Sequence, residues 1–314
     1  MNRSTLLTLA ITPTMCIWAI SLLAAPPQVE KTFSVTEERT GVHVKTSDGR
    51  PVLHYVTQRP KNSKLSVQSA CYFHPVYTPK GEVLTDVAPD DHLHHRGVWL
   101  AFVEMHGKKD ADFWGWGQHA PKDKRVIESQ GVDVVAKKAD RAELRMQNCW
   151  LADGDEMLAE ELRTVVMERD RCFLIDLTYK LTPGEDAKIA RWAFSGFCFR
   201  GRKDGKVVAS GPKGKVELPE PSHLKPQTDW PSSPWYDFTI ELAGRKQIGM
   251  AVLDHPKNPK ALWYNSRTAR MLNPSICAPG EVQLKANQPL LLRYRLVAHD
   301  GPAPVDLLNK VAAE

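Results

Sequence analysis

The sequence predicts an all-β fold, a large two-sheet antiparallel sandwich that ends in a short helix. Three observations support this prediction. Apolar and polar residues alternate with a period of two along most of the chain, turn-forming pairs separate the alternating runs, and helical periodicity is confined to the carboxyl end. Because an antiparallel sheet commonly buries one face and exposes the other, the alternation indicates strands that each cover a core on one side.

The clearest predicted strand covers residues 173–181, where every odd position from Phe173 to Leu181 is apolar. Turn chemistry at Asp153-Gly154 and Pro183-Gly184 separates neighbouring runs. After Pro304, apolar residues at positions 305, 307, 308 and 311 form one face of a short helix. Further strands, in chain order, are predicted at residues 41–45, 52–56, 98–103, 131–136, 142–149, 161–167, 205–209, 238–242, 247–253 and 290–297.

The domain organisation follows from the lack of a linker-like tract after the amino-terminal segment. No Gly/Ser-rich or charged stretch divides residues 26–314, so the sequence predicts a single sandwich domain over that range. The proline-rich stretch 218–234 is either a wall of an active site or a plain surface loop.

Residues 1–25 have the pattern of a secretory signal. Arg3 precedes an apolar run over 6–23, and Ala24-Ala25 supplies small residues at a cleavage point. The alternative is an uncleaved membrane anchor, because the run is just long enough to span a bilayer. We therefore expect a secreted or periplasmic protein with no membrane contact beyond this segment.

Composition excludes several classes of protein. The 42 Lys and Arg residues nearly balance 37 Asp and Glu, so bulk charge does not favour a nucleic-acid partner. A hydrophobic content of 42% is enough for a large core and argues against disorder. After residue 25 the five cysteines are widely and irregularly spaced without a CxxC motif. This predicts mostly buried free thiols, at most one or two disulfides and no cysteine zinc site.

The strongest candidate site is the segment 90–97, Asp-Asp-His-Leu-His-His-Arg-Gly. If it is extended, His92, His94 and Arg96 project from one face and His95 from the other. Histidine is the side chain that most readily transfers protons near neutral pH, and it is also a common metal ligand. The alternative is a solvated histidine-rich turn before the strand that starts at residue 98.

The spacing around this segment does not favour a local metal site. A cupin-like pattern needs a glutamate three or four residues after His-x-His, and those positions hold Gly97 and Val98. A metal would therefore need a ligand from distant sequence, and the expectation is no cofactor.

Two further segments could contribute to the same site. Asp112 and Trp114 place a carboxylate beside a large ring, as in many carbohydrate sites, although Trp114 could equally be a core residue. Asp254 and His255 follow a hydrophobic strand, with Arg267 downstream, and strand ends are where sandwiches display functional groups. Asp254 could instead only brace its turn.

With these residues assembled, the sequence resembles a bacterial family of unknown function that carries the label PmoA, for methane oxygenase. The label does not indicate the activity, because a membrane oxygenase subunit would have several spanning segments. The resemblance implies a secreted or periplasmic protein of glycan-degrading bacteria with a galactose mutarotase-like sandwich, and it adds His74 as a candidate contact. It rests on the segments 72–79, 91–97, 112–115, 254–258 and 293–301.

These observations predict an extracytoplasmic carbohydrate-active protein that performs acid/base chemistry on a sugar or glycoside by mutarotation, cleavage or elimination. His92 or His94 would transfer one proton, and His255 with Asp254 would supply the second group across the cleft. The predicted substrate contacts are His74, Asp91, His95, Arg96, Asp112, Trp114 and Arg267.

Two alternatives remain open. In a non-catalytic glycan-binding module, the same residues would hold a carbohydrate without converting it. In a metal-dependent enzyme, His92, His94 and His255 would be ligands.

Overall fold

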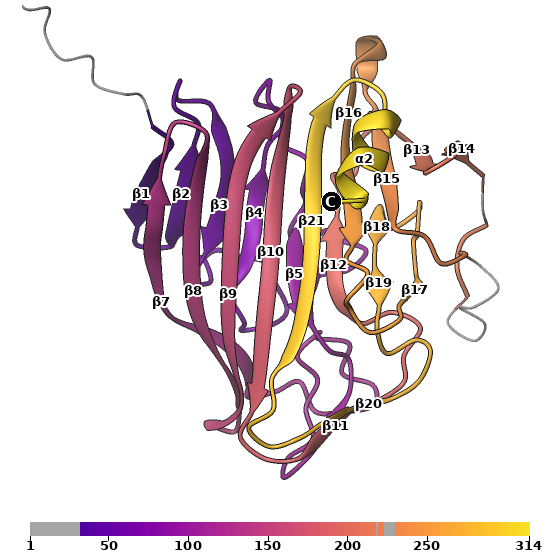
Figure 1. Ribbon diagram of the computed structural model, residues 1–314. Coiled ribbons are helices and arrows are strands. Elements are labelled where there is room, and N and C mark those ends of the chain that lie inside the picture. Colours follow the sequence, from indigo (N-terminus) through magenta and orange to yellow (C-terminus); the bar gives the residue numbers. More distant parts are fainter. Residues whose placement is uncertain (1–31, 218, 223–229) are drawn as a thin grey trace, which may run out of the picture. The chain divides into compact units, whose positions relative to one another are not determined.

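The computed structural model describes residues 32–217, 219–222 and 230–314, and contacts group residues 31–314 into one compact unit. This unit is an antiparallel β-sandwich with two large sheets, as the alternation predicts (Figure 1). The predicted secretory signal at residues 1–25 lies outside the described residues. Within the described ranges, no helix is both long enough and apolar enough to cross a membrane.

The larger sheet has nine strands, and most predicted strands belong to it. Every neighbouring pair in it is antiparallel. In spatial order the strands are β14 (Gly214–Val216), β13 (Lys206–Gly211), β15 (Trp235–Glu241), β16 (Gln247–Asp254), β21 (Leu290–Asp300), β10 (Cys172–Pro183), β9 (Asp155–Arg169), β8 (Arg141–Ala152) and β7 (Arg125–Lys137).

The second sheet has seven strands and carries the histidine segment in the loop before its fifth strand. Its order is β1 (Ser34–Glu38), β2 (Gly41–Lys45), β3 (Pro51–Val56), β4 (Tyr72–Val76), β5 (Val98–Ala101), β12 (Gly196–Arg200) and β18 (Met271–Leu272). The remaining short strands are β6 (Met105–His106), β11 (Ala187–Ile189) and β20 (Val282–Leu284) in one small sheet, and β17 (Leu262–Trp263) and β19 (Pro274–Ser275) in another.

The hydrophobic core lies between the two large sheets. Phe197 of β12 stacks on Tyr294 of β21 with ring centroids 4.1 Å apart, and the Tyr55 hydroxyl of β3 donates a hydrogen bond to Asn148 of β8 at 3.0 Å. These contacts define the inner face of each sheet. Because side chains alternate along a strand, the neighbours of these residues project from the outer faces.

The carboxyl-terminal helix α2 (Val305–Ala312) covers part of the outer face of the nine-stranded sheet (Figure 1). Its apolar side chains Leu308 and Val311 pack with Leu174 of β10 and Leu253 of β16 in a second hydrophobic cluster. The helix therefore buries outward-facing apolar side chains of the sheet, which explains why these strands are hydrophobic on both faces.

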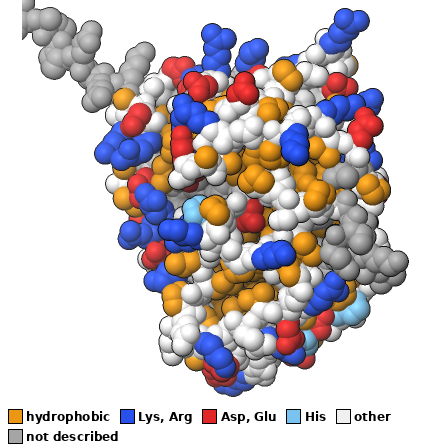
Figure 2. Space-filling model, turned by 45° about the vertical axis from the view of Figure 1, so that its right-hand side comes forward, with side chains coloured by type: hydrophobic (Ala, Val, Ile, Leu, Met, Phe, Trp, Pro, Cys, Tyr) orange, Lys and Arg blue, Asp and Glu red, His pale blue; other side chains and the backbone are white. Residues whose placement is uncertain are grey.

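The charged side chains are mixed on the surface, as the near balance of charges predicts, and the cysteines are free thiols. Figure 2 shows basic and acidic side chains intermingled with hydrophobic areas on one face of the molecule. Among the described residues all five cysteines are free thiols; Cys149, Cys172, Cys198 and Cys277 are buried and Cys71 is half-buried. The prediction of mainly buried free thiols is confirmed for this part of the chain.

Candidate functional site

A cavity of about 220 Å³ lies against the outer face of the seven-stranded sheet, where loops from distant parts of the chain meet. Phe197 of β12 faces the core, so Arg200, three positions later, projects outward toward this cavity. The lining consists of Asp91, His92, His94 and His95 before β5, Trp114 and Trp116 after β6, Phe194 before β12, and Tyr264, Ser266, Thr268, Ala269 and Met271 around β18.

The histidine segment folds as two successive turns before β5, so the extended arrangement considered from the sequence does not form and the segment has the turn conformation of the alternative. The backbone N–H of His92 donates to Pro89 O at 2.9 Å, and that of His95 donates to His92 O at 3.0 Å. The turns gather all three imidazoles instead of separating them onto two faces. The ring centroids of His92 and His95 are 4.5 Å apart, and His94 lies 5.7 and 4.7 Å from these two rings, respectively.

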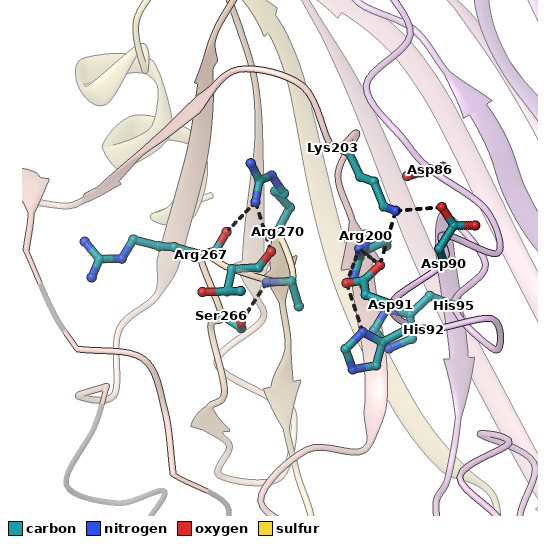
Figure 3. Close-up of polar contacts among 12 residues, drawn as sticks. Asp86, Asp90, Asp91, His92, His95, Arg200, Lys203, Ser266, Arg267 and Arg270 are labelled. Carbon is teal, nitrogen blue, oxygen red and sulfur yellow. Dashed lines mark hydrogen bonds and ion pairs between the residues drawn. The ribbon is translucent and has the colours of Figure 1, made fainter.

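Asp91 connects His92 to a buried arginine (Figure 3). The Nδ1–H of His92 donates to Asp91 Oδ2 at 3.0 Å, while Arg200 Nη2 donates to both carboxylate oxygens at 2.8 Å. Burial opposes ionisation of Asp91, but the hydrogen bonds from Arg200 and His92 outweigh it and lower its pKa to about 2. Because His92 donates through Nδ1, the neutral ring keeps Nε2 as a free base.

His95 and Lys203 complete the polar surroundings of Asp91. Arg200 Nη1 donates to His95 Nδ1 at 3.1 Å, so one guanidinium holds both Asp91 and His95. Lys203 Nζ lies 3.8 Å from Asp91 Oδ1 and 3.5 Å from Asp90 Oδ2 (Figure 3). A carboxylate held by these cations fixes the orientation of the His92 ring.

His94 is a deeply enclosed polar group of the cavity lining whose ring keeps one nitrogen without a partner among the described residues. Its side chain is 8% exposed, and the unpartnered nitrogen is Nε2. Burial, followed by the charges of His92 and Arg96, lowers the pKa of His94 to about 3. His94 is therefore uncharged at neutral pH, and it suits hydrogen bonding to a ligand better than donation of a proton from an imidazolium.

Aromatic rings form the other wall of the cavity. Trp114 is fully buried and Trp116 half-buried, with the Trp116 ring 5.9 Å from His94 and 5.3 Å from Phe194. Tyr264 follows at 5.2 Å from Phe194. Trp114 thus lines the cavity although it is also part of the core. An apolar wall opposite polar groups is the usual composition of a small-molecule site.

Arg96 does not line the cavity, contrary to its predicted role as a substrate contact. Its side chain is 1% exposed and donates through Nη2 to Phe113 O at 2.9 Å, with the guanidinium over the Trp99 ring. The Arg96 backbone pairs with Val87 in an isolated antiparallel bridge. Arg96 supports the floor of the site from below.

Asp112 and His74 also have structural partners and lie outside the cavity lining. The Asp112 carboxylate accepts hydrogen bonds from the backbone N–H groups of Gly115 and Gly117, at 2.7 and 2.5 Å, which shapes the tryptophan loop. His74 Nδ1 is 2.9 Å from the Thr85 hydroxyl, and burial lowers its pKa to about 4. These two predicted substrate contacts therefore bind structural partners and do not face the cavity.

Arg267 stands between the lining residues Ser266 and Thr268 but does not line the cavity itself. Its side chain points away from the histidine cluster (Figure 3), and its Nε lies 3.7 Å from Glu220 Oε1. Glu220, from the described start of the proline-rich stretch, accepts hydrogen bonds from the Ser266 hydroxyl at 2.7 Å and the Thr268 N–H at 3.1 Å. Residues 218 and 223–229 of that stretch lie outside the described residues. Its described part thus reaches the site.

Asp254 and His255 lie in a different cavity, so the prediction that they face His92 across one cleft is wrong. Their cavity shares no lining residue with the first and lies on the outer face of the nine-stranded sheet. They follow β16, which belongs to that sheet. The ligand set His92, His94 and His255 is therefore not assembled, and the described residues contain no group of three His, Cys, Asp or Glu side chains placed to hold a metal.

Sequence reasoning missed Arg200, Phe194, Tyr264 and the serine and threonine of the rim. Arg200 is separated from Asp91 by more than 100 positions, and no local pattern marks it. Trp116 is the additional lining residue that the sequence could have indicated, because it stands two residues after Trp114 in the same loop.

Comparisons with known proteins give a family and a set of solved structures. The model of a family of unknown function, DUF6807, matches residues 43–313, and no curated protein matches the sequence. A Geobacillus stearothermophilus α-galactosidase solved with stachyose is 8% identical to this chain, with a TM-score of 0.41. The match covers 88% of this chain and 40% of the α-galactosidase chain. A galactose mutarotase related enzyme from Lactobacillus acidophilus is 7% identical, covers 85% and 97%, and has a TM-score of 0.35.

A galactose mutarotase-like protein from Lactobacillus casei is also similar, with 8% identity, coverage of 85% of this chain and 100% of its own, and a TM-score of 0.33. The chain spans about two fifths of the length of the α-galactosidase chains that it matches.

Proposed function

The chain belongs to DUF6807, a family of unknown function, and from the chemistry of its own site we propose that it is a carbohydrate-active protein that transfers protons on a bound sugar ring. The observation that carries the proposal is the Asp91–His92 pair, which faces an aromatic wall in one small cavity. Because residues 1–25 have the pattern of a secretory signal, we also propose that the protein acts outside the cytoplasm.

His92 is the proposed proton-transfer residue. An imidazole that donates Nδ1–H to a fixed carboxylate presents Nε2 as a general base and can return the proton as a general acid. Asp91 orients His92, and Arg200 fixes Asp91 with two hydrogen bonds. His94, which is uncharged at neutral pH, would hold a hydroxyl of the ligand rather than titrate.

The cavity suits one sugar ring. Its volume of about 220 Å³ lies below the roughly 300–1,000 Å³ of sites for drug-sized ligands. Trp116 is half-buried and offers ring surface to the C–H face of a sugar, while Ser266 and Thr268 line the opposite rim.

The test is the substitution His92→Gln, which keeps a polar side chain but cannot exchange protons. Turnover is measured on a panel of free sugars, glycosides and sugar acids by NMR, which follows anomer exchange, cleavage and elimination in one experiment. We expect kcat to fall roughly 10²–10⁴-fold, the usual contribution of a general acid or base. Asp91→Asn should give a smaller loss, because it removes the orienting carboxylate and leaves the imidazole.

The matched control is His119→Gln, because His119 is exposed and contacts the Trp192 ring, with centroids 4.4 Å apart, outside the cavity lining. Its turnover should equal that of the unsubstituted protein. Full activity of the His92→Gln protein on the substrate it converts would refute the catalytic role.

A non-catalytic glycan-binding module is the second candidate function. The observation that favours it is the low pKa of His94, because an imidazole that stays neutral can bind a hydroxyl without transferring a proton. This candidate predicts saturable heat of binding in calorimetry with no product in the NMR panel. Product formation by the purified protein would exclude it.

A further inference from the structure

The second cavity, which contains Asp254 and His255, is larger than the histidine cavity. Its volume is about 440 Å³, within the roughly 300–1,000 Å³ typical of small-molecule sites. It is lined by β9, β10, β16 and β21 on one side and by the end of α2 on the other. The proton-transfer proposal leaves this cavity without a role.

The strand register places two arginines on either side of a hydroxyl group in this cavity. Thr178 of β10 pairs with Arg163 of β9 and with Arg293 of β21. Leu177 and Tyr179 point into the core, so Thr178 and its two partners point outward. Since neighbouring strands are roughly 4.8 Å apart, the backbones of the two arginines are separated by about 10 Å.

The charges around the cavity are only partly neutralised by one another. Arg295 is held by Asp176, with Nη2 to Oδ2 at 2.9 Å, and by Glu314 at 3.4 Å. Arg163 donates a single hydrogen bond, from Nε to Glu143 Oε1 at 2.7 Å. The third arginine, Arg293, has no side-chain hydrogen bond or ion pair among the described residues.

Lys257 likewise has no side-chain partner in the described part of the chain. Asp254 makes no ion pair with either cation; its carboxylate accepts a hydrogen bond from Asn258 at 2.7 Å, and burial raises its pKa to about 6. The pKa of His255 is lowered by burial and then by Arg293, Lys257 and Arg295, which is the effect of a locally positive potential. The cavity thus offers a guanidinium and an ammonium group that form no ion pair with the carboxylates of its lining, among the described residues.

We infer that this cavity is a second ligand site that binds a small hydroxylated carboxylate, a sugar acid, through Arg293. A guanidinium presents two parallel N–H donors that match the two oxygens of a carboxylate. Thr178, Arg163 and Lys257 then supply donors to the hydroxyl groups of the same ligand. The site is independent of the histidine cavity, and the inference does not depend on the proposed activity.

The experiment compares D-glucuronate with D-glucose by isothermal titration calorimetry on the full chain. We expect saturable binding of glucuronate that depends on Arg293, whereas any binding of glucose, which lacks the carboxylate, is unchanged by substitution of Arg293. Arg293→Gln should weaken glucuronate binding at least 10-fold, and Arg293→Lys should give an intermediate loss because it keeps the charge without the paired donors. Thermal unfolding of each variant verifies that it is folded.

Two control variants separate this site from other sources of binding. Arg145 stands next to Arg163 in the same row of the sheet but is exposed and outside the cavity, so Arg145→Gln should bind glucuronate normally. His92→Gln should also bind it normally, which distinguishes this site from the histidine cavity.

Three results would overturn the inference: no glucuronate binding by the unsubstituted protein, unchanged affinity in folded Arg293→Gln, or loss of binding in His92→Gln. Inorganic phosphate is titrated as a further arm. If it displaces glucuronate at equal concentration, the site is a general anion site and the assignment to a carboxylate is wrong.

Discussion

Glu160 places a carboxyl group in the interior between the two sheets. Its side chain is 5% exposed and accepts hydrogen bonds from Asn148 at 2.6 Å and Trp150 at 2.8 Å. Burial raises the pKa of Glu160 to about 7, although these hydrogen bonds act in the opposite direction. The group therefore titrates near neutral pH while the core surrounds it.

The sign of its effect on stability follows from this pKa. A carboxyl whose pKa is higher in the folded than in the unfolded protein contributes stability below the unfolded value of 4.5 and loses it as pH rises toward 7. We predict that the unfolding free energy of Glu160→Gln rises relative to that of the unsubstituted protein by roughly 2–3 kcal/mol between pH 5 and pH 8. Urea unfolding at several pH values measures this difference.

The neighbouring exposed residue supplies the control for that measurement. Glu161→Gln should show the same pH profile as the unsubstituted protein, because Glu161 lies on the outer side of the same strand. A pH-independent difference for Glu160→Gln would mean that Glu160 has the same pKa in both states.

Individual residues also show what sequence can and cannot predict about the site. The scarcity of histidine was enough to single out His92 and His94, and both line the cavity. Their partner Arg200 could not be found, because its role depends on how β12 pairs with β5. The burial of Arg96 outside the cavity lining was also not predictable, because a buried and an exposed arginine look alike in a local pattern.

At the scale of single elements, the tryptophan loop depends on a glycine. Gly115 has φ of +102°, and a Cβ atom there would lie 2.3 Å from Val67 Cγ1 and 2.9 Å from His94 Cβ. The missing side chain lets the loop pack directly against the histidine turns. It is thus a condition for the close approach of Trp116 and His94.

We predict that Gly115→Ala lowers the free energy of unfolding by about 1–3 kcal/mol more than Gly154→Ala, because the clash adds to backbone strain. Gly154 is matched, with φ of +87° and nothing within 4 Å of its added Cβ. Denaturant unfolding of both variants gives the comparison. Equal decreases in unfolding free energy for the two variants would show that the tryptophan loop moves to accept the added methyl group without losing stability.

The elements themselves were predictable where one face is buried. The runs at 41–45, 173–181 and 247–253 fall within β2, β10 and β16. β1 was missed because none of its five residues is buried, so it has no alternation to detect. β12 is the opposite case: all five of its residues are buried, so it too has no alternation to detect, and it is absent from the predicted strands.

On the scale of the whole molecule, the two polar clusters occupy different sheets and opposite outer faces. Local sequence does not encode the sheet to which a strand belongs, and that choice separates His255 from His92. The sequence therefore predicted the residues of both clusters. It contained no information that the two clusters lie in one cleft.

This separation predicts independent behaviour of the two cavities. The double variant His92→Gln, Arg293→Gln should change the unfolding free energy by the sum of the single changes, within roughly 0.3–0.5 kcal/mol, as expected for distant sites. Denaturant unfolding of the four proteins measures the coupling. A coupling above 1 kcal/mol would show that the sheets transmit changes between the two faces.

The five cysteines of the described residues are all unpaired, and this has a consequence for chemical labelling of the molecule. The sandwich shields four of these thiols, and burial raises the pKa of Cys149 to about 12 and of Cys172 to about 11. Only the thiolate reacts readily with alkylating reagents, so the closed molecule is nearly inert toward them. Alkylation of a buried cysteine therefore requires local unfolding around it. The rate of labelling at each buried cysteine measures how often that part of the sandwich opens.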